Sequence, residues 1–479
     1  MSDIPYPRDL VGYGAKPPHP HWPGEARIAV QFVINYEEGG ENCILHGDAA
    51  SEAFLSEIVG AQPWPGERHM NMESIYEYGA RTGFWRLHRL FTERAIPVTV
   101  FGIASAMARN PEAVAAMNEA GWEIASHGLK WIDYRGFSAE TEAEHIAEAI
   151  RIQEVVAGTR PLGFYQGRTS ENSLWLTMKE GGFLYSADSY ADELPYWITG
   201  PNGRGSEGPF LVVPYTLDAN DMRFATPQGF NSGDQFFAYL RDSFDTLYAE
   251  GASAPKMMSV GLHCRLVGRP GRAAALARFL DHIQSKSHVW CATRLDIARH
   301  WVMQHPPAGG YRPSHLSEPL FMARFGSIYE HSPWVAARAF AKGLSGACDS
   351  ATGLHAVMDA AMRAGSHEEQ LALIKAHPDL AGRLALAKQL TADSTTEQRS
   401  AGLDQLSGEE LARFSALNEA YMTRFGFPFI MAVKGRRKDE ITAAFETRLR
   451  NGPEQEFARA LDEISRIARL RLNDILPDA

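Results

Sequence analysis

The chain has 479 residues, of which 45% are hydrophobic and 22% are charged, and its formal net charge is −11. This length predicts two domains, because a single hydrophobic core rarely serves more than about 250–300 residues. The acidic balance argues against a nucleic-acid partner, which would require a basic surface. No stretch approaches the roughly 18 consecutive apolar residues of a membrane span, so we expect no membrane partner either.

The first 305 residues alternate short apolar runs with helical patterns. Runs of strand length lie at 27–35, 97–103, 122–126, 161–165, 183–186, 210–215, 257–262 and 288–292. Helical periodicity is clearest at 83–94 and 139–156. This alternation predicts an α/β domain with a parallel sheet, closed or open. Such folds carry their functional sites on the loops that follow the carboxyl ends of the strands.

Polar residues follow five of these predicted strands directly. They are Glu37 and Glu38 after the first strand, His127 after the third, Arg168 after the fourth, Asp188 after the fifth and His263 after the seventh. Gathered at one edge, such groups could activate water, protonate a leaving nitrogen and stabilise an oxyanion. Each one alone could equally be a strand-end residue that bonds a neighbouring loop. Their recurrence at successive strand ends favours a site.

Residues 305–315 contain three prolines and two glycines and have no apolar period. Such composition is typical of a connector. We therefore expect a first domain at 1–305, a linker at 306–317 and a second domain at 318–479.

After the connector, the apolar patterns have a helical period. Ser332-Pro333 is typical of a helix start, and Ser366 with Glu369 and Ser407 with Glu410 have the spacing of capping boxes. These signals predict an all-helical second domain. The four cysteines, Cys43, Cys264, Cys291 and Cys348, lie far apart, and the N-terminus lacks the build of a signal peptide. Both features predict reduced thiols in a cytoplasmic protein.

The order of the polar segments in 1–305 resembles the polysaccharide deacetylase superfamily. That family has a deformed (β/α) barrel with an acidic pair, a His-x-x-x-His metal motif, an arginine segment and a late histidine motif. In this chain Glu37-Glu38 stands at the acidic pair and Leu262-His263 at the last motif. Trp131 stands four residues after His127, where the metal motif has its second histidine.

Residues 35–42 (NYEEGGEN), 165–173 (YQGRTSENS) and 188–197 (DSYADELPYW) together resemble the allantoinases recruited from this superfamily. The resemblance implies opening of the hydantoin ring of allantoin without a metal or another cofactor. Amide hydrolysis of this kind then requires a carboxylate base and a nearby cation. We expect Glu37 or Glu38 to be the base and His263 the proton donor. We assign His127 and Arg168 to substrate binding and charge stabilisation.

Three segments of the second domain, 377–382 (HPDLAG), 394–402 (STTEQRSAG) and 424–436 (RFGFPFIMAVKGR), resemble the 2-oxo-4-hydroxy-4-carboxy-5-ureidoimidazoline (OHCU) decarboxylases. The resemblance implies that His377 handles the proton, with Glu397 as its partner. It also implies a pocket lined by Pro378, Ser394 and Gln398, by the backbone of Phe429, Ile430, Met431, Ala432 and Val433, and by Arg436, which would hold a carboxylate. We expect His377 to titrate near its ordinary pKa, although by itself it could be a helix-end histidine.

The two resemblances imply consecutive reactions, from OHCU to (S)-allantoin and from allantoin to allantoate. We therefore expect a cytoplasmic bifunctional enzyme of purine degradation that acts on small molecules without a cofactor, and the resemblance implies a homo-oligomer. Two alternatives remain for residues 1–305. One is a metal-dependent N-deacetylase of amino sugars, and the other is a non-catalytic oligomerisation scaffold for the decarboxylase.

Overall fold

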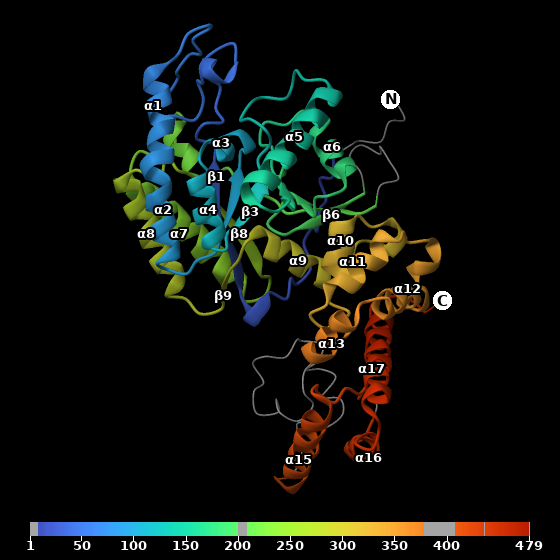
Figure 1. Ribbon diagram of the computed structural model, residues 1–479. Coiled ribbons are helices and arrows are strands. Elements are labelled where there is room, and N and C mark those ends of the chain that lie inside the picture. Colours follow the sequence, from blue (N-terminus) through green and yellow to red (C-terminus); the bar gives the residue numbers. More distant parts are fainter. Residues whose placement is uncertain (1–7, 200–207, 378–407, 435, 479) are drawn as a thin grey trace. The chain divides into compact units, whose positions relative to one another are not determined.

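The computed structural model describes residues 8–199, 208–377, 408–434 and 436–478. The chain divides into two compact units, Met1–Pro307 and Ala308–Ala479, and Figure 1 colours it in sequence order. Within the described ranges, no helix has both the length and the apolar character needed to cross a membrane.

The first unit is built on one nine-stranded sheet. Its strands are β1 (Ile28–Tyr36), β2 (Val98–Gly102), β3 (Glu123–Ser126), β4 (Gly163–Phe164), β5 (Tyr185–Ser186), β6 (Tyr196–Ile198), β7 (Phe210–Val212), β8 (Lys256–His263) and β9 (Val289–Cys291). The order is β6-β7-β5-β4-β3-β2-β1-β8, and β9 pairs with β1. Strands β6 and β7 pair antiparallel, and the other pairs are parallel. The predicted α/β architecture is confirmed, with β6 as a strand that the sequence did not predict.

Helices cover the sheet (Figure 1). They are α1 (Met70–Tyr78), α2 (Phe84–Thr92), α3 (Ala104–Arg109), α4 (Pro111–Glu119), α5 (Ala139–Ala157), α6 (Ser173–Glu180), α7 (Gly233–Glu250), α8 (Pro270–Gln284) and α9 (Arg294–Gln304). Helix α8 packs against both α2 and α7. The two helical patterns predicted at 83–94 and 139–156 correspond to α2 and α5.

Strand β1 explains how the site is positioned. All nine of its residues are buried. Its even-numbered residues, from Ile28 to Tyr36, join the apolar core beneath the helices. Gln31 and Asn35 lie on the opposite face, where Gln31 Nε2 contacts Met257 Sδ of β8 at 3.1 Å. Because side chains alternate along a strand, the next residue on the face of Gln31 and Asn35 is Glu37.

The segment from α1 to α2 runs close to the loop after β8. A π-helix, Gly79–Gly83, joins the two helices. A Cβ atom on Gly79 would overlap the side chain of Glu38, and one on Gly83 would overlap the backbone carbonyl of Cys264. Glycine at these two positions therefore permits the close approach.

The second unit is helical. Its helices are α10 (Glu318–Phe325), α11 (Pro333–Ala341), α12 (Ala351–Arg363), α13 (His367–Ala376), α15 (Gly408–Phe425), α16 (Lys438–Arg448) and α17 (Pro453–Asn473). No strand occurs in the part of this unit that the structure describes, so the all-helical prediction is confirmed. Ser366 and Glu369 form the predicted capping box at the start of α13.

Candidate active sites

A cavity of about 450 Å³ opens at the carboxyl ends of the strands in the first unit. It brings together four residues that the sequence predicted, Glu37, His127, Arg168 and His263. The rest of its lining is Asn35, Phe54, Leu55, Trp131, Asp133, Arg135, Tyr165, Gly167, Thr169, Tyr190, Tyr215, Leu217, Asn220 and Met222. The cavity therefore joins acidic, basic and aromatic groups that are distant in the sequence.

The two candidate bases lie in different places. Glu37 lines the cavity, and its Oε1 lies 3.3 Å from His127 Nε2 and 3.5 Å from His263 Nε2. Glu38 lies beneath Gly79 on the helix side, where its Oε2 accepts a hydrogen bond from the Glu37 amide at 3.2 Å. Burial raises the pKa of both carboxyls, but for Glu37 the positive charges of Arg265 and His263 and the hydrogen bonds from His127 and His263 outweigh burial and hold the pKa well below its usual range. For Glu38 the pKa remains raised.

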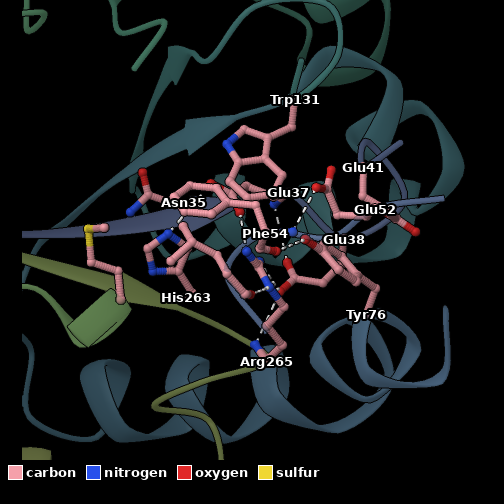
Figure 2. Close-up of polar contacts among 12 residues, drawn as sticks. Asn35, Glu37, Glu38, Glu41, Glu52, Phe54, Tyr76, Trp131, His263 and Arg265 are labelled. Carbon is pink, nitrogen blue, oxygen red and sulfur yellow. Dashed lines mark hydrogen bonds and ion pairs between the residues drawn. The ribbon is translucent and has the colours of Figure 1, made fainter. Parts of the chain in front are cut away.

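Arg265 is a residue that the sequence analysis did not select. Its side chain is completely buried, and Figure 2 shows it pointing at both glutamates. Nη2 donates to Glu37 Oε2 at 2.6 Å, Nη1 lies 3.4 Å from Glu38 Oε1, and Nε donates to the Leu55 carbonyl at 2.9 Å. The guanidinium carbon also lies 4.4 Å from the ring centroid of Tyr76 and 5.2 Å from that of Trp131.

Asp221 is a second residue that the sequence analysis missed. It begins the 3-10 helix Asp221–Ala225, directly after a β-bridge between Asn220 and Gly261 of β8. Its Oδ1 lies 2.6 Å from Nδ1 of His263, so Nε2 is the atom that His263 directs at Glu37. Burial lowers the pKa of His263, but Glu37 and Asp221 outweigh it and raise the pKa to about 9. His263 is therefore an imidazolium at neutral pH and can donate a proton.

His127 and Arg168 also line the cavity. His127 donates from Nδ1 to the Tyr165 carbonyl at 2.9 Å, which leaves Nε2 towards Glu37. The guanidinium carbon of Arg168 lies 5.2 Å from the ring centroid of Phe54 and 5.0 Å from that of Trp131. The rings of Phe54 and Trp131 stack with centroids 5.8 Å apart. This aromatic and cationic wall suits a flat, polar ring.

The residues around Glu37 do not fit the metal that the family motif implies. Oε2 of Glu37 is bonded to Arg265, whose fixed positive charge disfavours a second cation beside it. Trp131 lies against this arginine and brings no ligand atom. Among the described residues, no group of three or more His, Cys, Asp and Glu side chains is arranged to hold a metal ion.

In the second unit, His377 follows α13 as its C-cap and is buried. Its Nδ1 donates to the Leu373 carbonyl at 2.9 Å, so in the neutral ring Nε2 is the nitrogen that can accept a proton. Burial lowers the pKa of His377 to about 4. The expectation that this histidine titrates near its ordinary pKa is therefore wrong, because the helix end on which it lies is packed away from water.

The segment from Phe429 to Val433 is buried and held by two charged side chains of neighbouring helices. Arg448 of α16 donates to the Ile430 carbonyl at 2.6 Å, and Glu463 of α17 accepts from the Ala432 amide at 3.0 Å. Arg436 donates from Nε to the Ala432 carbonyl at 3.2 Å. The Ala432 amide therefore already has a partner. Four predicted site residues, Pro378, Ser394, Glu397 and Gln398, lie outside the described residues.

Two family models match the chain. The polysaccharide deacetylase model matches residues 72–180, and the OHCU decarboxylase model matches residues 314–473. A Schizosaccharomyces pombe protein named as a member of the polysaccharide deacetylases is 45% identical over 314 residues, which are 62% of this chain and 98% of the relative. A 2-oxo-4-hydroxy-4-carboxy-5-ureidoimidazoline decarboxylase from Haloferax volcanii is 46% identical over 159 residues, or 33% of this chain and 90% of the relative.

Among solved structures, the crystal structure of Puue allantoinase is similar to the first unit. The two share 60% sequence identity over 63% of this chain and 98% of the other, with a TM-score of 0.61. The similarities together cover both halves of the chain without overlap in the family models. The chain therefore belongs to two families at once, the polysaccharide deacetylases through its first unit and the OHCU decarboxylases through its second.

Proposed function

We propose that this chain is a bifunctional enzyme of purine degradation, whose second unit decarboxylates OHCU to (S)-allantoin and whose first unit hydrolyses allantoin to allantoate. The observation that carries the proposal is the union of an allantoinase-like unit with an OHCU decarboxylase unit. The product of the second reaction is the substrate of the first. In the first unit, the pairing of Glu37 with an imidazolium at His263 supplies the base and acid that amide hydrolysis needs.

In the first unit we assign Glu37 as the base that takes a proton from water as the water oxygen attacks a hydantoin carbonyl. His127 and Arg168 bind the substrate and stabilise the oxyanion. The C–N bond of the ring then breaks, and His263 gives its Nε2 proton to the departing nitrogen. Glu37 lines the cavity and Glu38 does not, so the geometry favours Glu37 for this role.

In the second unit we assign His377 as the proton-handling residue. Loss of CO₂ leaves an electron pair that the adjacent ring imine accepts, and a proton must then reach one face of the ring. The chemistry therefore requires orientation and one positioned proton carrier. The neutral ring of His377 bonds its helix through Nδ1 and not through Nε2, so Nε2 can exchange a proton with the substrate. Glu397 is proposed as its partner, with Pro378, Ser394, Gln398, residues 429–433 and Arg436 around the substrate.

We propose that the enzyme is cytoplasmic, acts on small molecules and assembles as a homo-oligomer. The support for the compartment is that all four cysteines are free thiols. The assembly is proposed from the family resemblance alone. The proposed boundaries are a first domain at 1–305 and a second at 318–479, and the division after Pro307 supports them.

The test supplies freshly generated OHCU to the full chain and follows (S)-allantoin by circular dichroism and allantoate by chromatography. We expect OHCU to disappear faster than its spontaneous decay and allantoate to accumulate. The H377A variant should lose the first step only, and the E37Q variant should stop at optically active allantoin. A full chain that leaves added allantoin intact would refute the allantoinase half of the proposal.

A further inference from the structure

Complete burial of an arginine is costly unless its donors are bonded, because a guanidinium is strongly stabilised by water. Arg265 meets this condition with three different partners. Two are the carboxylates of Glu37 and Glu38, and the third is the Leu55 carbonyl. Tyr76 and Trp131 cover the guanidinium with their rings. This side chain is therefore held in one position and can hold its neighbours in turn.

The first of these neighbours is the proposed base. Arg265 binds Oε2 of Glu37 at 2.6 Å, whereas Oε1 faces His127 and His263 at 3.3 and 3.5 Å. The two oxygens of the Glu37 carboxylate thus have different partners. A bond to Oε2 opposes rotation of the carboxylate and leaves Oε1 as the atom directed at the two histidines.

The second neighbour is the pair of stacked rings, Phe54 and Trp131, in the wall of the cavity. The Leu55 carbonyl that accepts from Arg265 follows Phe54 in the chain, and the Phe54 ring stacks on Trp131 with an interplanar angle of 16°. Phe54 is 41% exposed, so its own packing restrains it only in part. Trp131 touches the same guanidinium. One buried cation therefore contacts both the base and the support of the wall.

We propose that Arg265 is a positioning residue for allantoin hydrolysis, which orients Glu37 through Nη2 of its guanidinium and the chain at Phe54 and Leu55 through Nε. The proposal rests on the proposed allantoinase function of the first unit. Arg265 does not line the cavity, so it acts through these neighbours and not by touching the substrate.

The experiment uses the full chain and compares R265K, R265A and the matched control R272K. Arg272 lies on the same stretch of chain but pairs with Glu57, with its side chain 22% exposed. Lysine keeps the charge but lacks the planar fork that reaches three partners. We expect kcat for allantoin to fall about a hundredfold in R265K, as for a misplaced catalytic group. KM should rise as the wall loosens, and R272K should retain wild-type values. OHCU decarboxylation reports that the chain is otherwise intact.

Chemical rescue separates positioning from simple stabilisation. Guanidinium added at low millimolar concentration should raise kcat of R265A about tenfold or more and leave the wild type unchanged, because the ion can occupy the vacated place. If R265A does not fold, R265K decides alone. Wild-type kcat in folded R265K, or a folded, slow R265A that guanidinium fails to rescue, would overturn the proposal. A wild-type chain without allantoin hydrolysis would instead refute the proposed function.

Discussion

Asp221 Oδ1 lies 2.6 Å from His263 Nδ1, and Asp221 Oδ2 accepts the backbone amide of the same histidine at 2.8 Å. This buried carboxylate thus fixes both the ring and the charge of His263. Since an adjacent anion favours the imidazolium, D221N should lower the pKa of His263 from about 9. The alkaline limb of kcat/KM for allantoin should then move to lower pH by about one unit or more.

The measurement is the pH profile of allantoin hydrolysis for both proteins. The sign of the stability effect follows from the same pKa. His263 binds its proton more tightly in the folded state, so this contribution is fully present below the unfolded value of about 6.5. It is lost as the pH rises through about 9. An unchanged alkaline limb in D221N would mean that another group carries the proton.

The two adjacent glutamates offer a matched pair of variants. E37Q removes the base that lines the cavity and should lower kcat for allantoin about a hundredfold or more. E38Q keeps the shape of a side chain that lies outside the cavity lining, and it should reduce kcat far less. Steady-state kcat values of both variants decide the assignment, with thermal unfolding as the control that both variants are folded at the assay temperature. A larger loss in E38Q would reverse it.

Metal dependence can be tested directly. Arg265 already neutralises Glu37, so we expect allantoin hydrolysis by the full chain to survive exhaustive chelation. Added Zn²⁺ should not increase the rate. Elemental analysis of the same samples provides the control for complete removal. A stoichiometric metal whose loss abolishes turnover would contradict the expectation and favour a metal-dependent hydrolase.

Replacement of His377 should separate the two activities. H377A is expected to lower OHCU decarboxylation about a hundredfold or more, the scale of general acid–base catalysis. Allantoin hydrolysis should stay unchanged, because that site belongs to the other unit. Since the pKa of His377 is lowered to about 4, the wild-type rate should not fall through protonation of this residue between about pH 5 and 8. Near-normal decarboxylation in H377A would leave it a helix-end histidine.

The division of the chain predicts that each half folds alone. Residues 1–305 and 318–479, expressed separately, should each unfold cooperatively, because each unit contains its own packed interior. Thermal unfolding followed by circular dichroism measures this for both fragments and for the full chain. Two insoluble fragments beside a cooperative full chain would show that the cores depend on each other.

Apolar runs located most of the sheet because a strand buried on both faces must be apolar almost throughout. Strand β1 is such a case, with all nine residues buried. Strand β6 was missed because it has only three residues, which are partly buried and follow Pro195 directly, and so short an apolar run does not predict a strand. Strands β4 and β5 have two residues each and are shorter than the apolar runs that predicted them, at 161–165 and 183–186. The runs are longer because residues beyond the paired backbone are buried as well.

The candidate site was predictable where a residue follows or ends its own strand, as with Glu37, His127 and His263. The choice between Glu37 and Glu38 follows from the alternation that places Asn35 inward. Arg265 lies two residues after His263 in the chain, and this proximity to a predicted site residue is a signal that could have revealed it. Asp221 gave no such signal, because it reaches His263 through the bridge between Asn220 and Gly261. Pairing across that distance is not encoded in any local pattern.

The geometry of the candidate site in the first unit depends on two glycines of the π-helix, Gly79 and Gly83. A methyl group on Gly79 would push against Glu38, which binds the backbone amide of Arg265 at 3.1 Å. A methyl group on Gly83 would push away the carbonyl of Cys264, the residue between His263 and Arg265. Mutational scans of this chain should therefore find inactivating alanines at two positions that contribute no atom to the cavity lining. A survey confined to pocket residues would overlook them.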